Sequence, residues 1–419
     1  MLLTYDWRGI RQIERLSSRD VPRRWRRTFG MAYTVLEEED IIRVMAYFKY
    51  GILCFAHGAN SENFDIWDIP NPPRLTDIAW NQPLNPTERV RFKTVDLQTV
   101  SGITFFYSRV GRLLRVHGHT AQEPTAEGTF NQIRPEFQPD VLWIYCPVSE
   151  KDTITAVGLR TRKPPPAGWP LPPYFTASYQ TQFNFLIRFA LAGDISIGYH
   201  YPNYNDVVLC GSKPSLLVHK SDMYPLDATV GVYPRDATSR DIAPFQPLWK
   251  DVALPDRYWP ERENFSAAPL AGVRRIQIFV RDSPPPPRCQ GILLAYEDGA
   301  ERALGECRVG VGPSTAYQNP ARVCFRLAWE PRARHRHARG GPFGWYEVEA
   351  GGDAKHTHAG GRERGGWACF GMAGILGFWF AHDCTAITIA GGTAIPDRGP
   401  RPRSDRYFLR SRRGRSSST

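Results

Sequence analysis

Residues 102–118 read GITFFYSRVGRLLRVHG and contain the clearest folding signal in the chain. Ile103, Phe105 and Tyr107 recur at every second residue, which places them on one face of an extended strand. Gly111 then closes the segment SRVG, where a glycine accommodates the positive φ angle that tight hairpin turns require. A second apolar run follows, so the stretch predicts an antiparallel β-hairpin.

A second stretch has the same pattern. Residues 291–305 read GILLAYEDGAERALG, with Ile292, Leu294 and Tyr296 on one face and an Asp-Gly turn after them. Two hairpins of one kind favour a repeated β architecture. The alternative is that the two hairpins are alike by chance, as hairpins of β proteins often are.

Short runs rich in β-branched and aromatic residues, separated by turn residues, continue through most of the chain. Few segments with a helical period lie between them, which argues against βαβ units and favours antiparallel pairing. The sequence therefore predicts a mainly β protein, an antiparallel sandwich or prism with a short helical N-terminus and a partly disordered basic C-terminus. The predicted strands are Gly51–Ala56, Gly102–Tyr107, Leu113–Gly118, Val141–Tyr145, Thr153–Leu159, Ile195–Tyr199, Val273–Val280, Gly291–Tyr296, Arg322–Trp329, Gly374–Phe380 and Thr385–Ile389.

The two ends of the chain differ from its middle. Ile10, Ile13 and Leu16 are spaced by three residues. This spacing predicts a helix over Arg8–Leu16, and Glu37–Val44 is expected to form a second one. Two stretches near the C-terminus are dominated by Arg, His and Gly and are predicted to be disordered. The predicted organisation is a helical segment 1–50, a first β region 51–220, an irregular connection 221–271, a second β region 272–330 with 366–390, and disordered segments 331–365 and 391–419.

The composition is that of a folded protein, since 42% hydrophobic and 12% aromatic residues in a chain of 419 can build a substantial core. Much of the net charge of +11 lies in residues 331–419, which contain 15 Lys and Arg against 7 Asp and Glu. Such a tail can bind nucleic acid through phosphates, or can simply be a solvated terminus. No apolar run reaches the roughly 20 residues of a membrane span, and the N-terminus lacks the apolar segment of a signal peptide. The sequence therefore predicts a cytoplasmic or nuclear protein.

The motifs of the common catalytic sites are missing from the sequence. There is no phosphate-binding GxxxxGK[ST] loop, no HExxH and no GxSxG. The eight cysteines contain no CxxC pair and are expected to be free thiols. Asp65 and Asp68 are considered as the paired carboxylates of a hydrolase, with acids beside a core tryptophan as the alternative.

Three His-x-His pairs are candidate metal ligands, because residues i and i+2 of a strand share a face. They are His117/His119, His335/His337 and His356/His358. The first pair is the best placed, at the end of a predicted strand, although two ordinary histidines beside a glycine turn would look the same. The other two pairs fall in a segment predicted to be disordered, so no metal site is predicted from them.

Five stretches have a pattern in common with a known group of proteins. They are VSGITFFY at 100–107, RVHGH at 115–119, GVRRIQI at 272–278, CQGILLAYEDG at 289–299 and RALGECRVG at 302–310. Together they resemble a region of uncharacterised fungal F-box-associated proteins. The F-box itself is not found here, so the resemblance implies no role in a ubiquitin ligase. The hairpin pattern is also faintly similar to jacalin-like β-prism lectins, which implies a sugar ligand without identifying its site.

These observations predict a non-enzymatic binding or adaptor protein whose β domain binds a protein or a glycan. The residues assigned to ligand binding are Tyr107, His117, His119, Tyr296 and Asp298. No catalytic residue, cofactor or metal is predicted. Two alternatives stay open: a hydrolase that uses the first histidine pair or the paired acids, and a nucleic-acid binder that acts through the basic tail.

Overall fold

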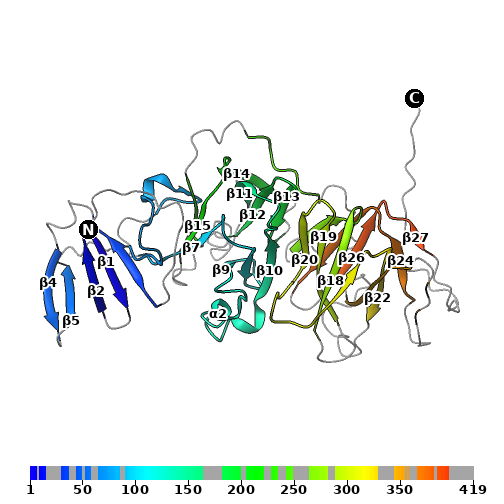
Figure 1. The fold of residues 1–419 in the computed structure, drawn as a ribbon, viewed down its shortest axis with the longest axis horizontal. Helices are drawn as coiled ribbons and strands as arrows, with labels where there is room; N and C mark the ends of the chain where they lie inside the picture. Colours follow the sequence, from blue (N-terminus) through cyan, green and yellow to red (C-terminus); the bar gives the residue numbers. More distant parts are fainter. Residues whose placement is uncertain are drawn as a thin grey trace, which may run out of the picture.

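The computed structural model consists of antiparallel β-sheets along one long axis, with the N-terminal strands at one end and the C-terminal strands at the other (Figure 1). It confirms the predicted mainly β fold. No helix in the described part of the chain is long and apolar enough to cross a membrane. The structure describes residues 1–6, 9–15, 30–36, 44–49, 52–57, 65–84, 90–163, 182–199, 204–220, 228–234, 242–248, 264–281, 288–328, 344–353, 356, 358, 366–381 and 385–395.

The N-terminal part is built of strands, so the helix predicted over Arg8–Leu16 is wrong. Strand β2 occupies this stretch and pairs with β1, with Ile13 opposite Leu3. A β-bulge then shifts the register, so that Ile10 lies opposite Tyr5. The extra residue in β2 puts Ile10 and Ile13 on one face despite their three-residue spacing, and the strand thereby imitates a helical period. The strands of this part are β1 (Leu2–Asp6), β2 (Gly9–Glu14), β3 (Ala32–Val35), β4 (Val44–Lys49) and β5 (Ile52–His57), in sheets β2-β1-β3 and β4-β5.

Three sheets form the central part. Strand β8 lies in the middle of one sheet, and all of its residues are buried. Phe105 of β8 packs on Phe185 of β12 with ring centroids 4.6 Å apart, so two of the sheets share a core. The sheets are β6-β16-β15-β7, β10-β8-β9 and β13-β12-β11-β14. Their strands are β6 (Ala79–Trp80), β7 (Phe92–Asp96), β8 (Gly102–Tyr107), β9 (Leu113–His119), β10 (Leu142–Pro147), β11 (Ile154–Arg162), β12 (Phe183–Phe189), β13 (Asp194–Ile197), β14 (Tyr204–Cys210), β15 (Leu216–Lys220) and β16 (Val230–Tyr233). The helical turns here are η1 (Leu75–Asp77), α2 (Glu127–Phe130) and η2 (Gln138–Asp140).

Three more sheets form the C-terminal part. Buried apolar side chains from these sheets belong to the same core cluster as those of the central part. The sheets are β20-β19-β18-β21, β17-β25-β26 and β23-β22-β24-β27. Their strands are β17 (Asn264–Pro269), β18 (Val273–Arg281), β19 (Arg288–Tyr296), β20 (Glu301–Gly305), β21 (Ser314–Gln318), β22 (Arg322–Ala328), β23 (Trp345–Gly351), β24 (Ala368–Gly371), β25 (Ile375–Phe380), β26 (Thr385–Ala390) and β27 (Ala394–Ile395).

Both predicted hairpins are present, as β8–β9 and β19–β20. Gly111 and Gly299 have φ angles of 78° and 94°, so each turn needs its glycine. The surroundings of the two hairpins differ, however. The second neighbour of β8 is β10, which follows its hairpin in the chain, whereas the second neighbour of β19 is β18, which precedes it. This difference in connectivity argues against an internal repeat.

Two ordered strands lie in stretches that were predicted to be disordered. Strand β23 lies within 331–365 and pairs along its whole length with β22, and β27 lies within 391–419 and pairs with β24. In β23 the alternation that buries Val348 and Ala350 is only seven residues long, and the surrounding Arg-, His- and Gly-rich sequence masks it. The rest of the basic tail, from residue 396, and most of the helix predicted over Glu37–Val44 lie outside the described residues.

Strand β20 and the residues after it connect the central and C-terminal parts. Arg302 of β20 donates to the carbonyl oxygen of Ala192, in the turn between β12 and β13. One carboxylate oxygen of Glu306 accepts the backbone N–H of Trp143, on β10, at 2.8 Å. Both contacts are buried, and a buried charged group is tolerated only where polar partners replace water. The junction therefore has a defined geometry.

Candidate metal centre

A row of three side chains crosses the sheet β23-β22-β24. Glu349 lies opposite Cys324, and Cys324 lies opposite Cys369 on the next strand. Directly opposite residues of antiparallel strands point to the same face. Both thiols are buried, and burial raises the pKa of the Cys324 thiol. The sheet register alone therefore brings together two cysteines that are far apart in the sequence.

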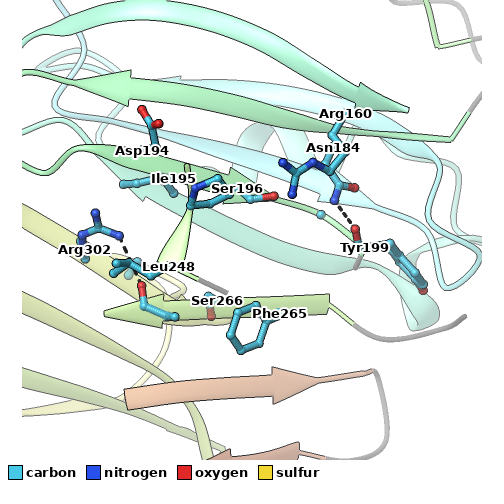
Figure 2. A pocket seen from close by; sticks show the side chains of 14 residues that line it. Arg160, Asn184, Asp194, Ile195, Ser196, Tyr199, Leu248, Phe265, Ser266 and Arg302 are labelled. Carbon is cyan, nitrogen blue, oxygen red and sulfur yellow. Dashed lines mark hydrogen bonds between the residues drawn. The ribbon is translucent and has the colours of Figure 1, made fainter. Parts of the chain in front are cut away.

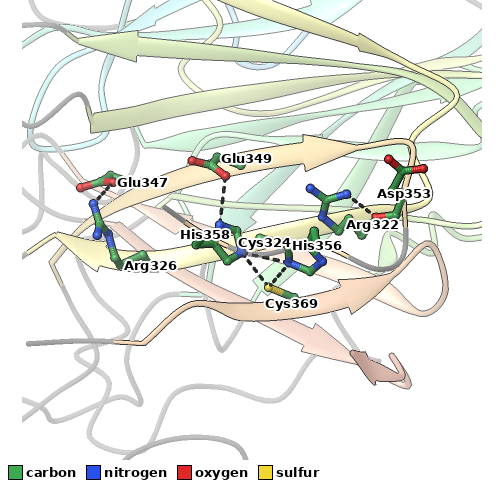
Figure 3. Close-up of polar contacts among 9 residues, drawn as sticks. All are labelled: Arg322, Cys324, Arg326, Glu347, Glu349, Asp353, His356, His358 and Cys369. Atoms are coloured by element: carbon green, nitrogen blue, oxygen red, sulfur yellow. Dashed lines mark hydrogen bonds and ion pairs between the residues drawn. The ribbon is translucent and has the colours of Figure 1, made fainter. Parts of the chain in front are cut away.

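Two histidines reach this face from the connection between β23 and β24 (Figure 3). The Nε2 atom of His356 lies 3.4 Å from Cys324 Sγ and 3.1 Å from Cys369 Sγ. It also lies 3.0 Å from His358 Nε2, which is itself 3.2 Å from Cys369 Sγ. The four donor atoms all lie within 4.8 Å of one another. A ring nitrogen carries either one lone pair or one proton and therefore makes one strong hydrogen bond. Nε2 of His356 has three neighbours at 3.0–3.4 Å, so hydrogen bonding alone does not account for all three contacts.

Glu349 orients one of the two rings. Its carboxylate oxygen lies 3.1 Å from Nδ1 of His358, whose side chain is only 6% exposed. With the Nδ1 proton donated to this carboxylate, Nε2 carries the lone pair and lies 3.2 Å from Cys369 Sγ. Metal-binding histidines in proteins typically have such a carboxylate on their other nitrogen.

An aromatic ring and its neighbours support His358 from the other side. Trp367 stacks on the imidazole with ring centroids 4.2 Å apart and an angle of 10° between the planes. The guanidinium of Arg326 lies 5.2 Å from the Trp367 ring centroid and pairs with Glu347. This arrangement fixes the plane of the imidazole as well as its direction.

The donor set is the one that zinc prefers. A tetrahedral zinc ion with bonds of about 2.3 Å to sulfur and about 2.0–2.1 Å to nitrogen separates its ligand atoms by about 3.3–3.8 Å. The three nitrogen–sulfur distances and the nitrogen–nitrogen distance given above are 3.0–3.4 Å, a few tenths of an ångström tighter, and the other two pairs lie within 4.8 Å. Two thiolates and two imidazoles favour Zn²⁺ over Mg²⁺ or Ca²⁺, which prefer oxygen ligands. Four protein ligands also complete the tetrahedron, as in structural zinc sites.

The first histidine pair, His117 and His119, makes hydrogen bonds within the fold. His117 Nδ1 lies 2.8 Å from Thr129 Oγ1, and its Nε2 lies 3.3 Å from the carbonyl oxygen of Glu123. His119 Nε2 lies 2.7 Å from Thr104 Oγ1, and burial lowers the pKa of this histidine. These contacts hold the loop after β9 against the hairpin, and the two rings meet edge to face. Their nitrogens do not converge on a shared point.

The other residues predicted to bind a ligand also have partners inside the fold. The hydroxyl of Tyr107 donates within the central core, and that of Tyr296 donates to the carbonyl oxygen of Pro269 at 2.7 Å. The carboxylate of Asp298 accepts the N–H of Ala300 at 2.9 Å and closes the β19–β20 turn. The structure does not bring these three residues together with the histidine pair into one site.

The paired acids lie in different environments. The Asp68 carboxylate accepts hydrogen bonds from the backbone and hydroxyl of Thr94, at 3.2 and 2.8 Å. Burial raises the pKa of Asp65 to about 6, against the lowering effect of the Val90 backbone N–H. Asp68 thus fastens β7 to the preceding segment, and Asp65 is an acid that the fold keeps protonated in mildly acidic solution.

The contribution of Asp65 to the free energy of unfolding is expected to fall as the pH rises from about 4 to about 6, because the folded chain binds the Asp65 proton more tightly than the unfolded chain in that interval. The substitution Asp65→Asn removes this contribution and should flatten the profile. Urea midpoints measured across the interval by intrinsic tryptophan fluorescence test this, with Asp77→Asn, at an exposed acid, as the control. An unchanged slope in Asp65→Asn would contradict the assignment.

A polar hollow lies at the junction of the central and C-terminal parts (Figure 2). The polar side chains that line this hollow make hydrogen bonds to other groups of the protein. Asn184 donates to the carbonyl oxygen of Tyr199, and Arg302 donates to that of Ala192. Arg160 makes two bonds of 2.8 Å to a carboxylate of β14. Only the Arg302 contact joins the two parts of the fold, and the other contacts lie within the central part. The metal centre is therefore the stronger candidate site.

Three of the four ligands of this site lie close together in the sequence. His356 and His358 are spaced for one strand face, and Cys369 follows shortly after them. The fourth ligand, Cys324, lies on a different strand, so no fixed spacing reveals it. Only the pairing of β22 with β24 makes the set complete.

No protein-family model matches the chain, and no curated protein sequence matches it. The F-box-associated and jacalin-like resemblances therefore stay predictions. The function has to be argued from the geometry of the site.

Proposed function

We propose that this chain is a non-enzymatic binding protein whose C-terminal sheets are stabilised by a structural zinc ion. The observation that carries the proposal is the convergence of four donors, Cys324, His356, His358 and Cys369, within 4.8 Å. Catalytic zinc sites keep a coordination position open for water or substrate, whereas four protein ligands fill it. The donor set therefore supports a stabilising role for the metal.

The wider role that we propose is that of an adaptor, with a protein or a glycan as its partner. The central and C-terminal parts share one core and are joined by buried polar contacts, which support a rigid platform for such a partner. We also propose a cytoplasmic or nuclear location, where reduced thiols persist. Neither Cys324 nor Cys369 forms a disulfide in the structure, as zinc binding through both thiolates requires.

The metal content of the purified full chain tests the proposal. About one zinc ion per chain is expected by elemental analysis, and cobalt substitution should give the intense visible bands of a tetrahedral thiolate site. The double variant Cys324→Ser/Cys369→Ser should lose the metal. His117→Gln/His119→Gln is the matched control and should keep it. A wild-type chain without zinc, or metal loss only in the control, would contradict the proposal.

Glu349→Gln is expected to lower the zinc affinity about 10- to 100-fold, since the neutral amide no longer increases the basicity of His358. The measurement is competition with a chelator of known affinity. Glu347→Gln is the control, because this residue lies on the same strand and pairs with Arg326 instead of a ligand. Equal losses in both variants would show that Glu349 has no special role.

A further inference from the structure

The two cysteines of the metal centre are also placed to form a disulfide. Cys324 and Cys369 face each other across β22 and β24, and their thiols are within hydrogen-bonding reach. Directly opposite residues have Cβ atoms about 4.5–5.5 Å apart, and a disulfide needs about 3.5–4.5 Å. A movement of about 1 Å or less therefore converts two metal ligands into a covalent bond.

Four other cysteines in the described part of the chain lack the surroundings of the metal centre. Cys146, Cys210, Cys289 and Cys307 are buried. Burial raises the pKa of the Cys146 thiol to about 12, and also raises those of Cys289 and Cys307. The thiolate is the reactive form of cysteine, and burial disfavours it at these sites as it does at Cys324, where a bound zinc ion would stabilise it. None of these four has a second cysteine and two imidazoles around it, as the thiols of the metal centre have.

We propose that the zinc centre is a redox switch, in which peroxide converts Cys324 and Cys369 to a disulfide and releases the metal. The inference rests on the proposed zinc site and adds its regulation. Disulfides in reducing compartments are usually transient and often serve redox sensing.

The reaction balances with hydrogen peroxide as the oxidant. One zinc-bound thiolate attacks a peroxide oxygen, the O–O bond breaks, and a sulfenic acid forms while hydroxide leaves and is protonated to water. The second thiolate attacks the sulfenic sulfur, the S–S bond forms, and a second water leaves. Two electrons pass from the two sulfurs to peroxide, and two protons are taken from solvent. Zinc leaves because its two thiolate ligands are gone.

Loss of the metal also releases His356 and His358. In the zinc-bound state these two residues tie the connection between β23 and β24 to the sheet face that carries Glu349. The disulfide keeps β22 and β24 paired but cannot hold the histidines. Oxidation is therefore expected to uncover this face while the sheet persists.

The experiment uses the full chain, with its zinc content measured before peroxide is added. Released zinc is followed with a colorimetric chelator, and the cysteines are assigned by alkylation and peptide mass mapping. The expected result is one Cys324–Cys369 disulfide for each zinc released, with zinc binding restored by dithiothreitol and zinc. The control variant Cys210→Ser, at a cysteine outside the site, should behave as the wild type.

The possible failures are distinguishable. A chain without zinc before oxidation overturns the proposed function, and this inference with it. A zinc-loaded chain that retains its metal under peroxide overturns the inference alone. So does a chain that releases zinc while Cys324 and Cys369 are recovered as separate sulfinic or sulfonic acids, or bridged to other cysteines.

Discussion

Removal of zinc is expected to lower the free energy of unfolding of the C-terminal sheets by at least about 4 kcal/mol, at a free zinc concentration about a thousand times the dissociation constant. The metal binds only where β22, β24 and the connection from β23 have come together, so its binding energy adds to the stability of that arrangement. Without it, the contacts of 3.0–3.4 Å among the thiols and imidazoles are hydrogen bonds, each worth only about 0.5–1.5 kcal/mol net. The effect should appear as a lower urea midpoint.

Trp367 provides a local reporter for this loss. Its ring stacks on His358 at 4.2 Å, so release of the histidine should change its fluorescence before the global transition. The control is the same chelator treatment of a His356→Gln/His358→Gln variant, which has no zinc to lose. If the wild-type chain unfolds at the same urea concentration with and without zinc, the metal does not stabilise the fold.

The sequence predicted those parts of the fold that depend on local patterns. Strands β8, β9, β18 and β22 begin at the predicted residue, because alternating apolar residues and turn glycines are short-range signals. The prediction failed where one residue changed the period. In β2 the bulge adds one residue between Ile10 and Ile13, so the two side chains share a face although they are three residues apart. A three-residue spacing is also typical of one face of a helix, so the sequence predicted a helix there.

Local sequence patterns did not predict the metal centre, for a different reason. The sequence shows the motif His356-Thr-His358, but the motif lies in a segment whose Arg-, His- and Gly-rich composition predicts disorder. Composition reports the average of a segment and does not exclude a strand of seven residues such as β23. Cys324 and Cys369 become neighbours only through sheet register, which is a long-range property.

Arg302→Met is expected to destabilise the chain by about 3 kcal/mol, which is the second largest effect that we predict. The Arg302 guanidinium donates to the carbonyl oxygens of Ala192 and Ala267, and the residue is only 8% exposed. Burial lowers the pKa of Arg302, so the charge is costly to hold here, and its removal recovers part of that cost. A buried carbonyl without a donor costs about 1–3 kcal/mol, and the loss at Ala192, with a smaller one at the partly buried Ala267 contact, outweighs the recovery.

The same substitution should loosen the turn between β12 and β13 in particular. The Asp152 carboxylate accepts the N–H groups of Leu191 and Ala192 at 2.8 Å and holds this turn from one side, while Arg302 holds it from the other. Urea unfolding and hydrogen exchange of the turn amides measure the two effects. Arg275→Met is the control, because the Arg275 side chain is 37% exposed and pairs at 3.6 Å with Glu301, a contact worth about 0.2–1 kcal/mol. Equal losses in the two variants would mean that Arg302 contributes no more than a surface arginine, and that the junction is held by its apolar core alone.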